Sequence, residues 1–214
     1  MSKKEYRIKN LDMFQYFYYN FFSNKIVRKG QGRIIPYKHA VLDLGDEAQI
    51  ILHDGDFHVN YHKPKGSKAE AYVKLMKGAV LEVYQETFLN YKSTIEVHEN
   101  ARIEIGSAYI NTGAVLLAAK SIRLGMNNLI SREVHIFDAD HHSIVDGQGR
   151  QKNLPKSVVL EDHVWIGLKT IILRGSWIGT GAMVAAGSVV GGKIKSGTMA
   201  SGNPARSYSR ISWM

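Results

Sequence analysis

The sequence predicts an all-β protein built as a parallel β-helix, and three observations support this fold class. A period of six residues runs through the last third of the chain, an earlier block has similar spacing, and one polar insertion separates the two blocks. An α-helix repeats its apolar positions every 3.6 residues and an amphipathic strand every two, so neither explains a period of six. Short strands joined by tight corners do explain it, because equivalent side chains stack from coil to coil.

The later block consists of the hexads LEDHVW, IGLKTI, ILRGSW, IGTGAM, VAAGSV and VGGKIK. The first position is aliphatic in all six hexads: Leu160, Ile166, Ile172, Ile178, Val184 and Val190. The fifth position is small in four of them: Thr170, Ser176, Ala182 and Ser188. We expect the aliphatic side chains to stack on one another and the small ones to let the backbone turn.

The earlier block begins at Val97, and its fifth positions are all small: Ala101, Ser107, Gly113, Ala119, Gly125 and Ser131. Its first position is looser, with Val97, Ile103, Tyr109 and Val115 followed by Ser121 and Asn127. The two blocks are out of phase, so an insertion must separate them. The polar segment DADHHSIVDGQGRQKNLP, residues 138–155, contains Gly147, Gly149 and Pro155 and predicts a loop leaving a rigid coil.

The chain divides into a helical cap segment over 1–36, a β-helix over 37–206 and a tail over 207–214. The repeat weakens before Val97, although residues 42–52 and 79–84 still indicate strands. Residues 9–24 are rich in aromatic side chains at helical spacing, which favours a cap over the first coil. The alternative is a helix that touches lipid, but the segment has too little Lys and Arg to favour it.

Composition limits the classes of function. The chain has 28 Lys and Arg against 19 Asp and Glu, a formal charge of +9, but no nucleic-acid motif accompanies this excess. Cysteine is absent, which excludes thiolate nucleophiles and disulfides. The N-terminus has no apolar signal region, and no apolar run approaches the ~20 residues of a membrane span. We expect a cytoplasmic protein with at most peripheral membrane contact.

Two segments together resemble the hexapeptide-repeat acyltransferases, and in particular the sugar and capsular-polysaccharide O-acetyltransferases. They are VWIGLKTIILRGSWIGTGAMVAAGSVV, residues 164–190, and SGNPAR, residues 201–206. The stretch IFDADHHSIVD, residues 136–146, is similar to the active-site loop of that branch. The resemblance implies a left-handed β-helix, a homotrimer with active sites between subunits, and acetyl-CoA as the acyl donor.

Acetyl transfer to a sugar hydroxyl requires a base, and a histidine suits this role because its unperturbed pKa is ~6.5. A capsular-type Asp-x-Asp-x-His pattern places the base at His142. The spacing back from Trp165 in galactoside and maltose acetyltransferases places it at His141. We favour His142, because Asp138 and Asp140 both match the first pattern, and either carboxylate could orient an imidazole; the alternative is that both only form turns.

The resemblance also implies a donor site. It suggests that Trp165 forms a wall, that the amide of Leu168 beside Gly167 stabilises the oxyanion, and that Ala186 contacts pantetheine. Gly191, Lys193 and Arg206 match positions near the nucleotide end of CoA. The chain is therefore predicted to be a cytoplasmic acetyl-CoA-dependent O-acetyltransferase of polysaccharide or glycolipid biosynthesis that needs no metal.

Three alternatives remain open. One is N-acetylation of a nucleotide-linked amino sugar, and another is a non-catalytic β-helix scaffold. The third is a metal-dependent hydratase like the γ-class carbonic anhydrases, which use three histidines on the same fold. His135, His141, His142 and His163 are available for a metal, but the spacing of that class is not matched.

Overall fold

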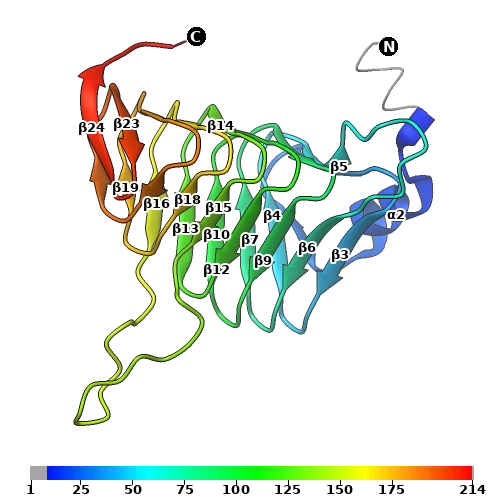
Figure 1. Cartoon of the computed structure of the whole chain (residues 1–214). Helices are drawn as coiled ribbons and strands as arrows, with labels where there is room; N and C mark the ends of the chain where they lie inside the picture. The colour runs from blue at the N-terminus through cyan, green and yellow to red at the C-terminus, as the bar shows by residue number, and fades with distance from the viewer. Residues whose placement is uncertain (1–8, 214) are drawn as a thin grey trace.

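The chain winds into a parallel β-helix, which confirms the predicted fold class (Figure 1). The computed structural model describes residues 9–213 of the 214-residue chain. Successive strands join three sheets in turn, so each coil contributes one strand to each sheet. Within the described residues these sheets have eight, nine and seven strands, and they are named below by these numbers.

The eight-stranded sheet contains β1 (Ile26–Arg28), β4 (Gln49–Leu52), β7 (Val80–Val83), β10 (Arg102–Ile105), β13 (Ser121–Leu124), β16 (Val158–Leu160), β19 (Trp177–Ile178) and β22 (Lys193–Ile194). The nine-stranded sheet contains β2 (Ile34–Pro36), β5 (Phe57–Tyr61), β8 (Thr87–Asn90), β11 (Ala108–Ile110), β14 (Asn128–Ile130), β17 (Trp165–Ile166), β20 (Met183–Val184), β23 (Thr198–Gly202) and the antiparallel β24 (Ala205–Arg210). The seven-stranded sheet contains β3 (Ala40–Leu44), β6 (Ala71–Leu75), β9 (Thr94–Val97), β12 (Val115–Ala118), β15 (His135–Phe137), β18 (Ile171–Ile172) and β21 (Val189–Val190).

The hexad pattern of the C-terminal coils is confirmed in detail. Every aliphatic first position from Leu160 to Val190 is fully buried, and every fifth position from Val164 to Ile194 is buried as well. Trp165 pairs with Met183, eighteen residues later, so one coil equals three hexads. The apolar stack inside the coils stabilises the C-terminal part of the β-helix.

The hexad register predicted for the earlier block is wrong at two positions. Tyr109 and Val115 were expected to be inward first positions, but their side chains are only partly buried, and the neighbouring Ile110 and Leu116 fill the core. The cause is coil length: Ile103 pairs with Ile122, nineteen residues later, so a repeat of eighteen drifts out of phase here.

A short helical segment covers the N-terminal end of the β-helix, as predicted. It comprises α2 (Met13–Phe17) and the π-helix η1 (Tyr18–Phe22), and the Asp12 carboxylate caps α2 by accepting from the Gln15 amide at 3.0 Å. The buried Asn20 side chain bonds both the amide and the carbonyl of Ile34 on the first coil. Strands β1 and β2 already lie within the segment 1–36.

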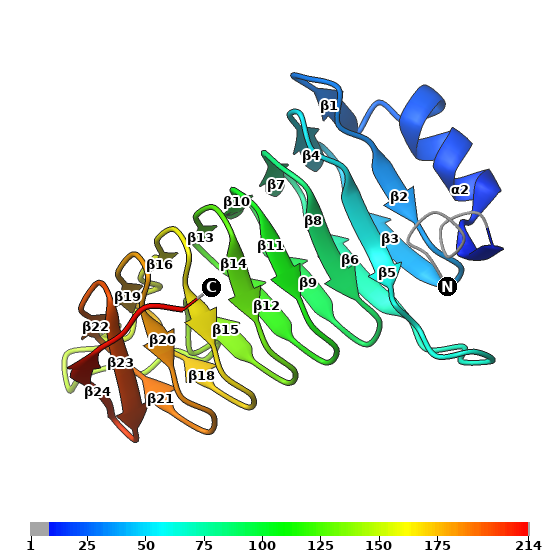
Figure 2. The ribbon, with the colours of Figure 1, turned by 90° about the horizontal axis from the view of Figure 1, so that it is seen from above.

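The predicted insertion forms a long loop, residues 138–157, between β15 and β16 (Figure 1). It leaves the β-helix at the corner between the seven-stranded and eight-stranded sheets. Figure 2 shows the nine-stranded sheet facing the viewer, with the loop behind it. No helix among residues 9–213 has the length and apolarity needed to cross a membrane.

Candidate active site

The first residue of the loop, Asp138, is fully buried and serves the backbone. Its two carboxylate oxygens accept hydrogen bonds from the amides of Ala119 at 2.7 Å and Lys120 at 2.8 Å. These amides belong to the corner of the preceding coil, which has no strand partner for them. Asp138 therefore fixes the point at which the chain leaves the coil.

Asp140 ties the two ends of the loop together. Its Oδ2 accepts from the Asn153 side-chain amide at 3.1 Å and from Arg174 Nε at 2.8 Å. The Asn153 hydrogen bond, followed by Arg174, lowers the pKa of this carboxyl. Asn153 is itself buried, donates to the His142 carbonyl at 2.6 Å and accepts from the Ile144 amide at 2.7 Å.

The two neighbouring histidines have different surroundings. His141 takes a positive φ of 59°, and its ring lies edge-on to Phe137 with centroids 6.1 Å apart. His142 is held through its backbone carbonyl, by Asn153. Within the described residues, neither Asp138 nor Asp140 forms a hydrogen bond with an imidazole. Both carboxylates hold the backbone and the loop instead, so the described residues do not show the imidazole-orienting contact that the sequence suggested for Asp138 or Asp140.

Sequence reasoning missed His98, which faces His141 from two coils earlier. The ring centroids of His98 and His141 are 5.1 Å apart, and Glu96 Oε1 lies 3.6 Å from His98 Nε2. Burial and the His98 charge lower the pKa of His141 below 6.5, although Asp138, Glu96 and Asp140 act in the opposite direction. A base with a lowered pKa stays neutral, and so able to accept a proton, at neutral pH.

The local sequence carried a faint signal for this cluster. Glu96 lies on β9, and His98, two residues after Glu96, directly follows that strand, so both lie on the same side of the chain. Lys74 on β6 adds a cation 3.4 Å from the same oxygen of Glu96. Which earlier coil the loop would fold back on could not be deduced from the local sequence.

Trp165 lies on the nine-stranded sheet. Its Nε1 donates to Ser131 Oγ at 3.2 Å, and its ring is 5.9 Å from that of Trp213 in the C-terminal tail. Trp213 stacks on His163 at 3.8 Å, which assigns His163 a structural contact. The tail residue Trp213 was not predicted as part of a site, yet it lines a hollow of about 420 Å³ together with Tyr109 and Leu129.

Gly167, Leu168 and Ala186 lie together at the corner between the nine-stranded and seven-stranded sheets. A side chain at Gly167 would meet the Ala186 nitrogen at 2.6 Å, so glycine is required for the coils to approach. The Gly187 amide donates to the Leu168 carbonyl at 2.8 Å. The amides of Leu168 and Ala186 donate no hydrogen bond to residues 9–213.

The other predicted donor-site residues lie elsewhere. Gly191 and Lys193 lie at the corner between the seven-stranded and eight-stranded sheets, two coils beyond the root of the loop. Arg206 lies on β24, where its guanidinium donates to the Ala205 carbonyl at 2.9 Å. A single chain therefore does not gather all the predicted CoA-binding residues at one corner.

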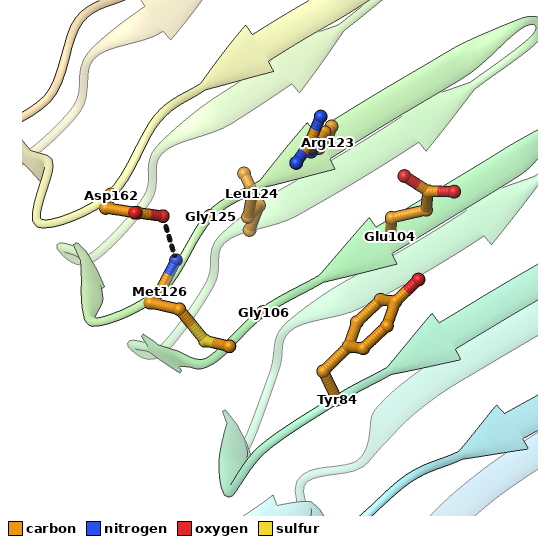
Figure 3. A pocket seen from close by; sticks show the side chains of 8 residues that line it. All are labelled: Tyr84, Glu104, Gly106, Arg123, Leu124, Gly125, Met126 and Asp162. Atoms are coloured by element: carbon orange, nitrogen blue, oxygen red, sulfur yellow. Dashed lines mark hydrogen bonds between the residues drawn. The ribbon is translucent and has the colours of Figure 1, made fainter. Parts of the chain in front are cut away.

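A further hollow, of about 270 Å³, lies on the outer face of the eight-stranded sheet (Figure 3). Tyr84, Glu104 and Arg123 line it, and Asp162 accepts from the Met126 amide at its edge at 2.7 Å. Neither loop histidine lines this hollow, so it is separate from the candidate site. Across residues 9–213, no group of three or more His, Asp or Glu side chains is arranged to hold a metal ion.

Comparison with known proteins gives relatives of one kind, although no family model matches the chain. The galactoside O-acetyltransferase of Escherichia coli is 27% identical over 150 residues, which are 68% of this chain and 70% of that protein. A maltose O-acetyltransferase of Clostridium difficile is 31% identical, with 62% of this chain and 67% of that chain covered and a TM-score of 0.43. Several other curated relatives match over only 50–60% of their own length.

Two further solved structures, both with a bound CoA species, are similar to the chain. A hexapeptide-repeat acetyltransferase of Vibrio cholerae, complexed with acetyl-CoA, is 31% identical over 55% of this chain and 64% of that chain, with a TM-score of 0.48. The N-acyltransferase AntD of Bacillus cereus, complexed with dTDP and CoA, is 15% identical and covers all of this chain and 90% of its own, with a TM-score of 0.52. The AntD likeness concerns the fold alone, and the related structures are left-handed β-helices.

Proposed function

Because the chain belongs to the hexapeptide-repeat acetyltransferases, we propose that it transfers an acetyl group from acetyl-CoA to a sugar hydroxyl. The observation that carries this proposal is the His141 imidazole, held at the root of a loop that leaves an otherwise continuous β-helix. The galactoside and maltose O-acetyltransferases among its relatives favour oxygen over nitrogen as the acceptor atom.

We assign the general base to His141. Its ring lies against Phe137 and His98, and its lowered pKa leaves it neutral at pH 7. His142 is placed by its backbone alone in the contacts described above. Asp140 is assigned the role of holding the loop closed, through Asn153 and Arg174.

The proposed chemistry is a direct transfer in a ternary complex. His141 takes the proton of the acceptor hydroxyl as that oxygen attacks the thioester carbonyl, and a tetrahedral oxyanion forms. The Leu168 amide, which has no partner among the described residues, is a candidate donor to this oxyanion. Collapse of the intermediate breaks the C–S bond, and the imidazolium returns the proton to the CoA thiolate.

The separation of the parts suggests that two copies of the chain form each site. The corner between the seven-stranded and eight-stranded sheets, where the loop leaves, carries His141, Arg174 and Lys193 in successive coils. Trp165 lies instead on the nine-stranded sheet, which faces away from the loop (Figure 2). Placing one copy's loop corner beside another copy's nine-stranded sheet would unite these residues. This supports the homotrimer with sites between subunits that the family resemblance implies.

In such a groove, acetyl-CoA would lie along the corner of Gly167, Leu168 and Ala186. The amides of Leu168 and Ala186, which have no acceptor among residues 9–213, can donate to the carbonyl oxygens of its pantetheine arm. Lys193 of the facing copy would meet its phosphates. The hollow beside Trp213, with Tyr109 and the polar Asn127, suits a sugar ring that has apolar faces and hydroxyl edges.

The test is to incubate the full chain with acetyl-CoA and a panel of mono- and oligosaccharides. Transfer is measured as the release of the free thiol of CoA. The change His141→Asn should lower turnover by about 10²–10⁴, the usual contribution of a general base. His142→Asn is the matched control in the same loop, and it should keep wild-type turnover. Full activity in His141→Asn, or loss confined to His142→Asn, would contradict the assignment.

A further inference from the structure

The N-terminal cap exposes an unusual number of aromatic side chains. Phe14, Phe21 and Phe22 are 82%, 64% and 77% exposed, and Met13, Phe17 and Tyr18 are each about half exposed. The chain has seven phenylalanines, and the four that are about half exposed or more all lie in this segment. Exposed apolar side chains gathered in one place mark a surface that binds a partner, unlike apolar residues scattered singly.

The capping role of the segment does not explain this face, because other residues perform it. Tyr19 packs against the core of the β-helix, Tyr16 packs against Ile35 and Tyr37, and Asn20 bonds the backbone of Ile34. The exposed aromatic side chains are therefore additional to the cap. We name Met13, Phe14, Phe17, Tyr18, Phe21 and Phe22 the aromatic face.

The helical segment itself has no Lys or Arg between residues 10 and 24, and for this reason the sequence did not favour a contact with lipid. The fold supplies the missing charge from elsewhere. Five lysines line a hollow of about 420 Å³ at the same end of the β-helix, and none of the described residues that line it is acidic: Lys9, Lys38, Lys63, Lys65 and Lys68. We name this group the lysine hollow.

The two features adjoin each other. The Lys38 amide donates to the Asn10 carbonyl at 2.9 Å, which ties the lysine hollow to the start of the cap. Lys9 precedes Phe14 by five residues, a reach of at most about 18 Å. Burial and the charge of Lys38 lower the pKa of Lys63, as expected where cations crowd together.

We infer that this end of the β-helix docks on an anionic membrane surface. The aromatic face would enter the boundary between headgroups and acyl chains, where aromatic rings are favoured, and the lysine hollow would meet lipid phosphates. The net charge of +9 acts in the same direction. A protein partner would also cover apolar side chains, but the five adjoining lysines favour a negatively charged lipid surface.

This orientation leaves the loop clear of the lipid. Four strand spacings separate β3 from β15 in the seven-stranded sheet, which amounts to roughly 19 Å along the axis. Figure 1 shows the cap and the loop toward opposite ends of the β-helix. Docking by the cap and chemistry at the loop can therefore occur together.

The test is flotation of the full chain with vesicles of phosphatidylcholine alone, or of phosphatidylcholine and phosphatidylglycerol at a ratio of about 7:3, near the negative surface charge of natural membranes. We expect binding to the anionic vesicles that weakens with added salt, and little binding to the neutral ones. Phe14→Ser/Phe21→Ser/Phe22→Ser should lower the bound fraction about tenfold, because these side chains carry the apolar contact. Lys38→Gln/Lys65→Gln/Lys68→Gln should remove the preference for anionic lipid.

The matched control is Ile144→Ser/Val145→Ser/Leu154→Ser, which removes three apolar side chains of the loop that are 57–59% exposed and should leave vesicle binding unchanged. Circular dichroism melting curves establish that each variant is folded. Absence of binding to either vesicle at low salt would overturn the inference. So would phenylalanine variants that bind vesicles normally but change the mass measured by light scattering, since the face would then be a self-association surface.

Discussion

The coils after residue 157 and the loop before it are stabilised in different ways. In the coils, strands of two or three residues are held by a continuous stack of fully buried aliphatic side chains, from Val158 to Ile194. In the loop, most side chains are exposed, and hydrogen bonds centred on Asn153, Asp140 and Asp146 give it shape. Apolar stacking tolerates substitutions of similar volume, whereas hydrogen-bond geometry tolerates few changes.

The comparison predicts that stability resides in the coils and activity in the loop. The coil core should determine the free energy of unfolding, because apolar burial is the main stabilising contribution. The loop should determine the position of His141 and contribute little to global unfolding. Four substitutions, ordered from the largest expected effect to the smallest, separate these two roles.

Ile166→Ala should have the largest effect. Ile166 is fully buried in the stack between Ile130 and Val184, its neighbours in the sheet. Truncation leaves a cavity that rigid coils cannot close, and the free energy of unfolding should fall by about 2–5 kcal/mol. Ile171→Ala is the matched control, because Ile171 faces outward on the next strand and should change stability by less than about 0.5 kcal/mol. Equal losses in urea denaturation would refute the role given to the stack.

Asn153→Ala should have the opposite result, a loss of activity with little loss of stability. Its side chain joins Asp140, the His142 carbonyl and the Ile144 amide, so its loss releases the loop around His141. A displacement of about 1 Å can cost 10²-fold in rate, and we expect kcat/KM to fall by about 10–100-fold. The melting temperature should change little. Gln148→Ala at the exposed tip should alter neither quantity, and a large drop in melting temperature for Asn153→Ala would show that loop and coils unfold together.

His98→Asn tests whether a histidine on the coil surface tunes His141, the proposed base in the loop. His98 and burial lower the pKa of His141, while Glu96, Asp138 and Asp140 raise it. Removing the imidazole removes one of the lowering causes, so the pKa of His141 should rise toward 6.5. In the proposed mechanism activity depends on neutral His141, and the acidic limb of the kcat/KM profile should therefore move to higher pH, with the plateau above neutral pH retained.

The same measurement separates the tuning role from a structural one. If His98 only supports the fold, His98→Asn should lower activity at every pH without moving the limb. Glu96→Gln should move the limb in the opposite direction, because the Glu96 charge favours protonated His141. If His141→Asn abolishes turnover while His98→Asn leaves the limb in place, the base assignment stands and the tuning role fails.

The difference between coils and loop also explains how far the sequence could be interpreted. The six aliphatic positions from Leu160 to Val190 predicted the fold, because an eighteen-residue coil repeats the same side chain at the same depth. Before Val97 this rule fails, because the coils carry extra corner residues. Leu42, for example, pairs with Val73, which is 31 residues later instead of eighteen. The loop ends were predictable from the break in phase and from its polar residues.

The contacts inside the site were not predictable in the same way. Arg174 reaches Asp140 across 34 residues, and His98 meets His141 across 43, with nothing periodic linking either pair. The pattern Asp138, Asp140, His142 suggested an acid beside a base, but the two carboxylates bond the backbone of Ala119 and the side chain of Arg174. Polar partners depend on how the loop folds back, which the local sequence does not encode.

Asp146→Asn should have the smallest effect, confined to the loop tip. The Asp146 carboxylate accepts from the Gln148 and Arg150 amides and pairs with Arg150 and Lys152, contacts that lower its pKa to about 2. A lowered carboxyl pKa stabilises the tip above the unfolded value of 3.8, and this contribution is lost as the pH falls through about 2. Asp146→Asn therefore imitates the acid state at neutral pH.

The measurement is limited trypsin digestion at pH 8, because Arg150 and Lys152 are themselves the sites of cleavage. The variant should be cut faster at these two residues, while its melting temperature and its protection at coil lysines match the wild type. Asp162→Asn makes the same substitution in the coils, where the Asp162 carboxylate accepts from the Met126 amide at 2.7 Å, and its digestion is compared with that of Asp146→Asn. If Asp146→Asn were cut no faster, apolar contacts would have to hold the tip, and the contrast between hydrogen-bonded loop and stacked coils would fail at its simplest point.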